Sequence, residues 1–239
     1  MCGMSALLTL AVHRPGHIGA VIVTALVVWW CCYVGRRMKR FGAEGLFRRV
    51  LAAATAVVTL TVTVGWMIIL HNGGEGGVLP LHICDMAGLI APLVLFFRVR
   101  WLRAVLYFWA MGLTTQGFVT PIEQSGPDNV RFFLFWVNHG LVVGVAIYDL
   151  VVGGFRPSRA DLLRTIGITG AYATAIFFFN RVMGENYLFI GDSKPDEPTL
   201  IDALGAYPLR VVWMFLLAAL ALCLAQVPWE VARLRLNTK

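Results

Sequence analysis

The stretch Leu79–Asp85, with the sequence LPLHICD, brings a histidine, a cysteine and an aspartate to the start of an apolar segment. His82 and Asp85 are three residues apart and share one face of a helix, whereas Cys84 lies about 100° or more away from each. Ionisable side chains are costly in a segment that enters a bilayer, and polar residues at membrane depth usually mark a functional site. We therefore expect the function to centre on this stretch.

Asn138 and His139 form a second polar interruption, inside the apolar segment 132–152. They lie about two helical turns, or roughly 10 Å, from the start of that segment. Gly140 and Gly144 leave room beside His139 for a neighbouring helix. The sequence leaves open whether this helix turns His139 toward Cys84 or away from it.

Cys84 and His139 together have the chemistry of a nucleophile and its base. A buried thiol is protonated and reacts poorly, and a histidine within hydrogen-bond reach can take its proton and later return it to the leaving group. Asp85, His82 or Asn138 could orient the imidazole, as the third member of a triad does. Acyl transfer fits this pair, because a phospholipid ester sits at this depth and a thioester would form away from bulk water.

Other polar residues fall at the same ends of the apolar segments, and the opposite halves of these segments are almost purely Val, Leu, Ala and Phe. These additional polar residues are Thr114, Thr115, Gln116, Asn180, Arg181, Glu185, Asn186 and Tyr187. A polar chamber on one side of the membrane would satisfy these groups. Gln116, Asn138 or the Tyr187 hydroxyl could donate to an oxyanion, and Asn186 could contact the substrate.

Each of these residues also has a structural interpretation. A lone cysteine packs as a small hydrophobe, His139 could bridge two helices, and Asp85 could pair with Arg181 or His82. A metal site from His82, Asp85, His139 and Glu123 is chemically possible, but the spacing matches no metalloenzyme motif. We expect neither a metal nor another cofactor.

Composition predicts the elements that position these groups. The chain has 239 residues, is 59% hydrophobic and has a mean hydropathy of +0.74, which indicates an all-α polytopic membrane protein. The apolar runs are too long for a barrel and lack its period-two alternation. About 20 apolar residues span a bilayer, which gives seven predicted spans: 17–34, 50–70, 81–97, 102–119, 132–152, 162–179 and 208–227.

The basic residues predict the orientation. Fifteen of the 20 lysines and arginines fall in the segments after the first, third, fifth and seventh spans. The positive-inside rule then puts the N-terminus outside and the C-terminus in the cytoplasm. The net charge of +7 therefore indicates contact with anionic lipid headgroups and not with nucleic acid. The loop 180–207, which carries GDSKPDEP, is predicted to be an extracytoplasmic lid over the chamber, within a single domain covering 1–239.

At LPLHICD, at NHG (138–140) and along the ENYLF…KP…LIDALGAYP stretch, the sequence resembles the YwaF-type bacterial integral membrane proteins. Eukaryotic relatives of that family include an endoplasmic-reticulum acyltransferase that makes polyunsaturated ether phospholipids. The cysteine and histidine proposed as its catalytic pair correspond to Cys84 and His139. More distant relatives are small membrane hydrolases of fatty-acid esters that use a threonine and a histidine.

These observations together predict a seven-span acyltransferase of a bacterial cell membrane, acting on phospholipids or related fatty-acyl esters. Cys84 would carry the acyl group, and His139 would act as general base and then as general acid. Asp85 and His82 would orient the imidazole of His139 or bind a lipid headgroup. A fatty-acid ester hydrolase is one alternative. Another is a transporter or ligand-binding protein that uses the same chamber, although we find no internal repeat and the polar groups lie away from the midplane. The sequence leaves the acyl donor, the acceptor and the oligomeric state open.

Overall fold

The computed structural model describes residues 15–192 and 204–237, and over those ranges the chain forms helices and no strand. The elements are α2 (Pro15–Arg40), α3 (Glu44–Gly73), α4 (Ile83–Phe97), α5 (Arg100–Phe108), η1 (Trp109–Thr114), α6 (Gln116–Val119), α7 (Val130–Val151), α8 (Arg159–Met183), η2 (Tyr187–Phe189) and α9 (Leu209–Asn237). Every apolar segment predicted from the sequence is helical. The predicted all-α class is confirmed.

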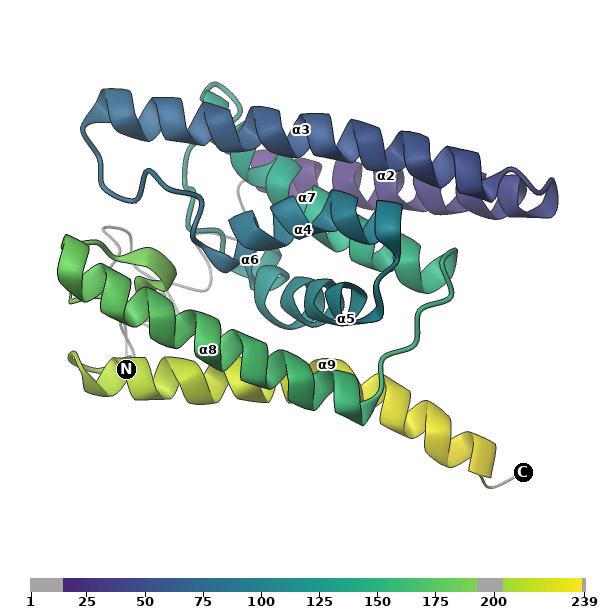
Figure 1. Ribbon diagram of the computed structural model, residues 1–239. Helices are drawn as coiled ribbons and strands as arrows, with labels where there is room; N and C mark the ends of the chain where they lie inside the picture. Colours follow the sequence, from purple (N-terminus) through teal and green to yellow (C-terminus); the bar gives the residue numbers. More distant parts are fainter. Residues whose placement is uncertain (1–14, 193–203, 238–239) are drawn as a thin grey trace.

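The helices form a bundle with two outer pairs and a central layer (Figure 1). α2 and α3 run along one side, α8 and α9 run along the other, and α4, α5 and α7 lie between them. α4 packs mainly on α3 and α7, whereas α5 packs on α8, and η1 packs on α9. We call the end where α4 begins, marked by Cys84, the thiol end. The end where α5 begins, marked by Arg100 and Arg103, is the arginine end.

Within the described ranges, five helices are long and apolar enough to cross a membrane: Pro15–Arg40, Glu44–Gly73, Val130–Val151, Arg159–Met183 and Leu209–Arg235. The other two predicted spans are shorter helices. α4 has 15 residues and is about 22 Å long at 1.5 Å per residue, less than the roughly 30 Å of a bilayer core. The segment 102–119 is divided among α5, η1 and α6. The count of seven spans therefore stays a prediction.

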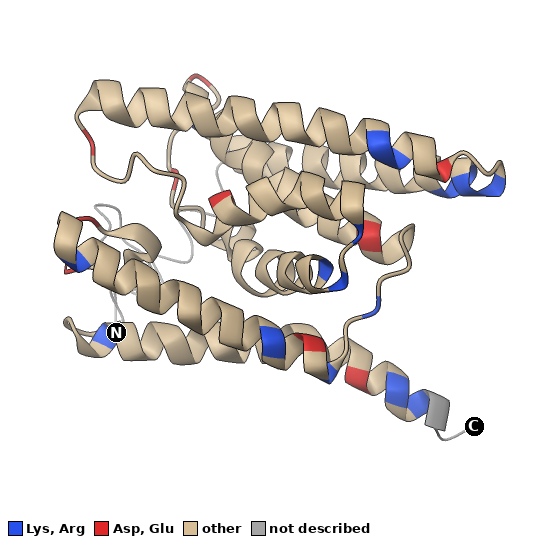
Figure 2. Ribbon diagram, viewed as in Figure 1, with Lys and Arg blue, Asp and Glu red and all other residues tan. Residues whose placement is uncertain are grey.

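The outside of the bundle is apolar, as lipid contact requires. Leu26 and Trp29 on α2 are 60% and 61% exposed, and α3, α8 and α9 also present large apolar side chains. Contiguous apolar surface of this kind is rare on soluble monomers. Figure 2 shows that charged residues gather near the two ends of the helices, with most of the lysines and arginines at the arginine end. This distribution fits helices that cross a membrane.

The central layer contains a π-helix. The Thr115 N–H donates to the Ala110 carbonyl at 3.0 Å, a spacing of five residues that replaces the α-helical four. Gly112 within it allows close approach of α9, because a Cβ there would lie 3.2 Å from the Ala221 carbonyl oxygen. π-turns occur frequently at functional sites. This one connects the buried α5 to α6 at the thiol end.

Pro92 inside α4 has no N–H to donate to the carbonyl of Gly88, four residues before it. An unsatisfied carbonyl is costly in an apolar environment. The Thr59 hydroxyl on α3 donates to that carbonyl at 3.2 Å. The proline thus creates a polar contact that fixes α3 against α4 one helical turn from Cys84.

Candidate functional site

The start of α4 holds the predicted site residues in place. The Asp85 carboxylate accepts a hydrogen bond from the backbone N–H of His82, with 3.3 Å between Oδ2 and N. An acidic side chain in the first turn is stabilised by the free N–H groups and dipole of the helix. This local cap fixes Asp85, and with it the neighbouring Cys84, at the first turn of α4.

Cys84, Asp85 and Asn138 form one hydrogen-bonded cluster. The Cys84 thiol donates to Asp85 Oδ1 at 3.8 Å, and the Asn138 amide donates to the same oxygen at 3.5 Å. Cys84 is partly exposed as a residue. Asn138 is buried on α7. The structure therefore brings three predicted site residues together, from two helices that are far apart in sequence.

Gly88 makes the approach of α7 possible. A Cβ at position 88 would lie 2.6 Å from Asn138 Oδ1 and 3.7 Å from the Thr59 methyl group. The absence of a side chain there lets the Asn138 amide lie against α4 and reach Asp85. Gly88 and Thr59 are positioning residues that the sequence analysis did not identify, although Pro92 four residues after Gly88 is a visible signal of a freed carbonyl.

His139 points to a different neighbour. Its Nδ1 lies 2.9 Å from the Phe135 carbonyl oxygen, and its ring stacks on the Phe135 ring at 4.0 Å. Because a carbonyl only accepts, Nδ1 carries the proton and Nε2 keeps its lone pair. A Cβ at Gly117 would lie 2.8 Å from Nε2, so the α6 backbone at Gly117 packs closely against this side of the ring. Within the described chain, no hydrogen bond joins His139 to Cys84 or Asp85.

A cap from the α8–η2 region covers the approach to α4. The Tyr187 hydroxyl accepts the Leu79 N–H at 2.9 Å, and Glu185 accepts the Gly77 N–H at 2.8 Å. The Asn180 side chain accepts the Tyr187 N–H at 2.9 Å and donates to the Tyr187 carbonyl at 2.8 Å. Burial raises the pKa of the Tyr187 phenol, which keeps this hydroxyl protonated at neutral pH. The part of the predicted lid up to residue 192 therefore packs on the LPLHICD stretch, and 193–203 lie outside the described residues.

Three other predicted site residues are placed differently from Cys84 and Asp85. His82 directs its ring to Tyr187 and Phe189, with ring centroids 5.6 and 5.1 Å away. The Asn186 side chain accepts the Gly191 N–H at 2.8 Å. Gln116 is exposed at the start of α6. Of the three, His82 borders the cluster and Asn186 stabilises the cap.

Tyr172 was not predicted as part of the site, and Thr114 was predicted only as one of the polar residues of the chamber. Tyr172 on α8 donates to the Leu81 carbonyl at 2.8 Å and interacts electrostatically with Asp85 and Cys84. Thr114 in η1 is buried, and its hydroxyl has no hydrogen-bond partner in the described structure. A buried polar group of this kind calls for a ligand or water. Among the described residues, no group of three His, Cys, Asp or Glu side chains could hold a metal ion.

Helices of this length and composition, with a polar cluster near one end of the bundle, define an integral membrane protein. The model of the TMEM164 family matches residues 10–225, and the chain belongs to this family. A protein of Treponema pallidum (strain Nichols), described as uncharacterized, is 28% identical over 233 residues, covering 93% of this chain and 91% of its own length. The comparison with solved structures finds no match. The finer resemblance to YwaF-type proteins stays a prediction.

Proposed function

We propose that this protein is a membrane-embedded acyltransferase that carries a fatty-acyl group on Cys84 as a thioester. The acyl donor is a phospholipid or a related ester, and His139 supplies general acid–base catalysis. The observation that carries the proposal is the cluster around the thiol: Cys84 is partly exposed and donates to Asp85, which Asn138 holds from α7. A cysteine that only packs would have apolar neighbours and no carboxylate.

The position of the cluster supports lipid chemistry. Cys84 lies in the first turn of α4, among helices whose outer surfaces are apolar. A phospholipid that diffuses in the membrane presents its ester bonds near the ends of such helices, at the depth of the first turns. The cap from Tyr187 and Glu185 lies over the same end of the bundle. A thioester formed there is kept away from bulk water.

We also propose that α4 and the α5–η1–α6 segment complete seven membrane crossings. The stretch from Arg100 to Val119 is about 30 Å long at 1.5 Å per residue, which is enough to cross. The arginine end would face the cytoplasm and bind anionic headgroups, and the thiol end would face outward. The Treponema relative supports a bacterial cell membrane as the location.

Intact-protein mass spectrometry tests the proposal. Purified protein is incubated with mixed phospholipids, and its mass is measured before and after hydroxylamine, which cleaves thioesters. The wild type should gain a fatty-acyl mass that hydroxylamine removes, and Cys84→Ala should gain none. Cys223→Ala is the matched control, because Cys223 is exposed on α9 away from the cluster. Wild-type turnover by Cys84→Ala would refute the nucleophile assignment.

Two other results would assign a different function. An adduct that decays to free fatty acid in the presence of acceptor alcohols would make the protein an ester hydrolase. Absence of any adduct, together with a requirement for Asp85 in cells, would indicate transport or ligand binding at the same cluster.

A further inference from the structure

The Cys84 thiol and the His139 imidazole have different hydrogen-bond partners. The Cys84 thiol donates to Asp85 Oδ1, whereas the His139 Nδ1–H donates to its own helix at Phe135. His139 Nε2 faces Gly117 on α6, and Asn138, one residue earlier, is the α7 side chain that reaches Asp85. Consecutive helical residues point about 100° apart, so the two α7 side chains serve different neighbours.

We propose that the two halves of the reaction use different bases: Asp85 takes the proton of the Cys84 thiol, and His139 takes the proton of the acyl acceptor. This inference rests on the proposed function and assigns its proton transfers. Asn138 is a positioning residue that holds Asp85 Oδ1 beside the thiol. Gly117 lies against the imidazole at Nε2, where any side chain would crowd an acceptor hydroxyl.

The surroundings of Asp85 suit it to this role. The titratable groups near its carboxylate are Cys84 on its own helix, His82 at the N-cap of that helix, Tyr172 on α8 and Tyr187 on η2. Within the described residues, no lysine or arginine forms an ion pair with Asp85. A carboxylate away from water and without a cation is costly as an anion, which favours its taking the thiol proton while the negative charge moves through sulfur to the carbonyl oxygen of the ester.

In the first half of the reaction, the acyl group moves from the lipid ester to Cys84. The Cys84 S–H bond breaks and its proton moves to Asp85, while sulfur bonds to the ester carbonyl carbon and the electron pair of the C=O bond moves to oxygen. The tetrahedral intermediate collapses, and the leaving lysolipid oxygen takes the proton from Asp85. In the second half, an acceptor alcohol gives its proton to His139 Nε2 as its oxygen attacks the thioester. The thiolate leaves and is protonated by His139.

A single-turnover measurement of the thioester adduct tests this division in full-length protein with phospholipid donor. Asp85→Asn should lower the rate of adduct formation about 100-fold or more, the usual contribution of a general base. His139→Gln should form the adduct at close to the wild-type rate and then accumulate it when acceptor alcohol is added. Asp128→Asn and His71→Gln are the matched controls, because both residues are exposed. Adduct formation by Asp85→Asn but not by His139→Gln would overturn the inference.

A second measurement separates this inference from the proposed function. The rate at which N-ethylmaleimide alkylates Cys84 is measured in a background whose other four cysteines are alanine. If Asp85 accepts the thiol proton, Asp85→Asn should alkylate at least 10-fold more slowly than wild type at pH 7. Above pH 10 it should alkylate at least as fast, because the repelling carboxylate is gone. Faster alkylation of Asp85→Asn at every pH would overturn the inference whether or not an acyl adduct forms.

Discussion

The two ends of the bundle both contain aspartates inside helices, but these carboxylates have different partners. At the arginine end, Asp149 accepts two hydrogen bonds from the Arg103 guanidinium at 2.7 and 2.8 Å, and Asp161 pairs with Arg100 at 2.6 Å. At the thiol end, Asp85 contacts a thiol, an amide and a backbone N–H, and no lysine or arginine pairs with it in the part of the chain that the structure describes.

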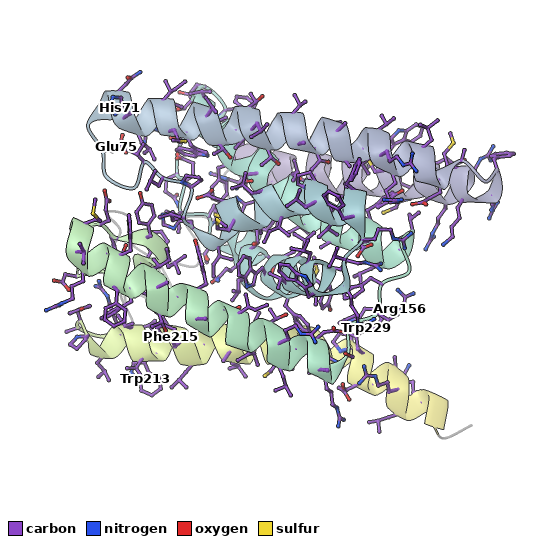
Figure 3. The ribbon with its side chains drawn as sticks, in the orientation of Figure 1. His71, Glu75, Arg156, Trp213, Phe215 and Trp229 are labelled. Atoms are coloured by element: carbon purple, nitrogen blue, oxygen red, sulfur yellow. The ribbon has the colours of Figure 1, made fainter. Side chains whose placement is uncertain are left out.

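The surroundings of the arginine end extend this contrast. Arg103 also donates to the Gly153 carbonyl, and the Arg156 guanidinium lies 5.2 Å from the Trp229 ring centre (Figure 3). The carboxylates of Asp149 and Asp161 are thus paired with guanidinium groups, as structural groups usually are. The thiol end keeps a carboxylate, a thiol and an imidazole lone pair without ionic partners. The comparison favours a structural role for the arginine end and is the basis for placing the proposed chemistry at the thiol end.

The largest expected effect is the loss of the Arg103–Asp149 pair. Arg103→Ala should lower the free energy of unfolding by about 3 kcal/mol, because Asp149 would be left buried without its partner. Thermal unfolding in detergent, followed by tryptophan fluorescence, measures the change. The double variant Arg103→Leu with Asp149→Leu should recover much of the loss. A single variant as stable as wild type would remove the structural role assigned to this end.

Gly88→Ala should act at the thiol end without unfolding the bundle. The added Cβ would lie 2.6 Å from Asn138 Oδ1, so the amide must shift and its bond to Asp85 weakens. We expect adduct formation to slow by about 100-fold, the usual cost of a misplacement of about 1 Å. Gly170→Ala is the control, because a Cβ at Gly170 meets nothing within 4 Å. Equal rates for the two variants would exclude Asn138 as a positioning residue.

Gly117→Ala should affect the other half of the reaction. Its Cβ would lie 2.8 Å from His139 Nε2 and would occupy the space beside it. We expect adduct consumption to slow by about 10-fold, part of the roughly 100-fold that a general base contributes, with adduct formation unchanged. Gly167→Ala provides the comparison, since nothing lies within 4 Å of its Cβ position. Slower adduct formation in Gly117→Ala would argue against a separate role for His139.

The smallest effect should come from the ion pair of Glu75, after α3, with Arg131 on α7. The hydrogen bond from Arg131 lowers the pKa of Glu75 below its ordinary value of 4.5. Since the folded pKa is depressed, the pair stabilises the fold above about pH 4.5 and loses this contribution as pH falls through the folded pKa. Glu75→Gln should lower Tm slightly at pH 7 and not at pH 3. A Tm difference that grows on acidification would contradict this sign.

The sequence predicted the helices and the polar groups at one end, because apolar length and residue type are local properties. It could not predict which α7 side chain faces α4. Asn138 and His139 are adjacent, so the rotation of α7 against α4 decides between them, and packing of Gly88 against Asn138 sets that rotation. The sequence paired Cys84 with His139 by chemistry and left their contact open, and the structure gives the thiol a hydrogen bond to Asp85.

The fourth predicted span also contains a feature that depends on a contact between distant residues and could not be predicted from local sequence. The apolar run 102–119 has no proline or charged residue after Arg103 that would indicate a change of helix type. The π-helix at Trp109–Thr114 arises where Gly112 packs against α9, a contact between residues far apart in sequence. Gln116 follows this segment and is exposed, and its role as an oxyanion donor stays a prediction.

One paired measurement tests the central contrast most directly: specific activity and Tm of Asp85→Asn and Asp149→Asn, taken on the same preparations with mixed phospholipids. Asp85→Asn should keep or exceed the wild-type Tm and lose acyl transfer, because it removes an anion that has no cation. Asp149→Asn should lower Tm and keep the activity of the protein that remains folded. A destabilised Asp85→Asn, or an Asp149→Asn that is stable and inactive, would contradict the assignment of chemistry to the thiol end.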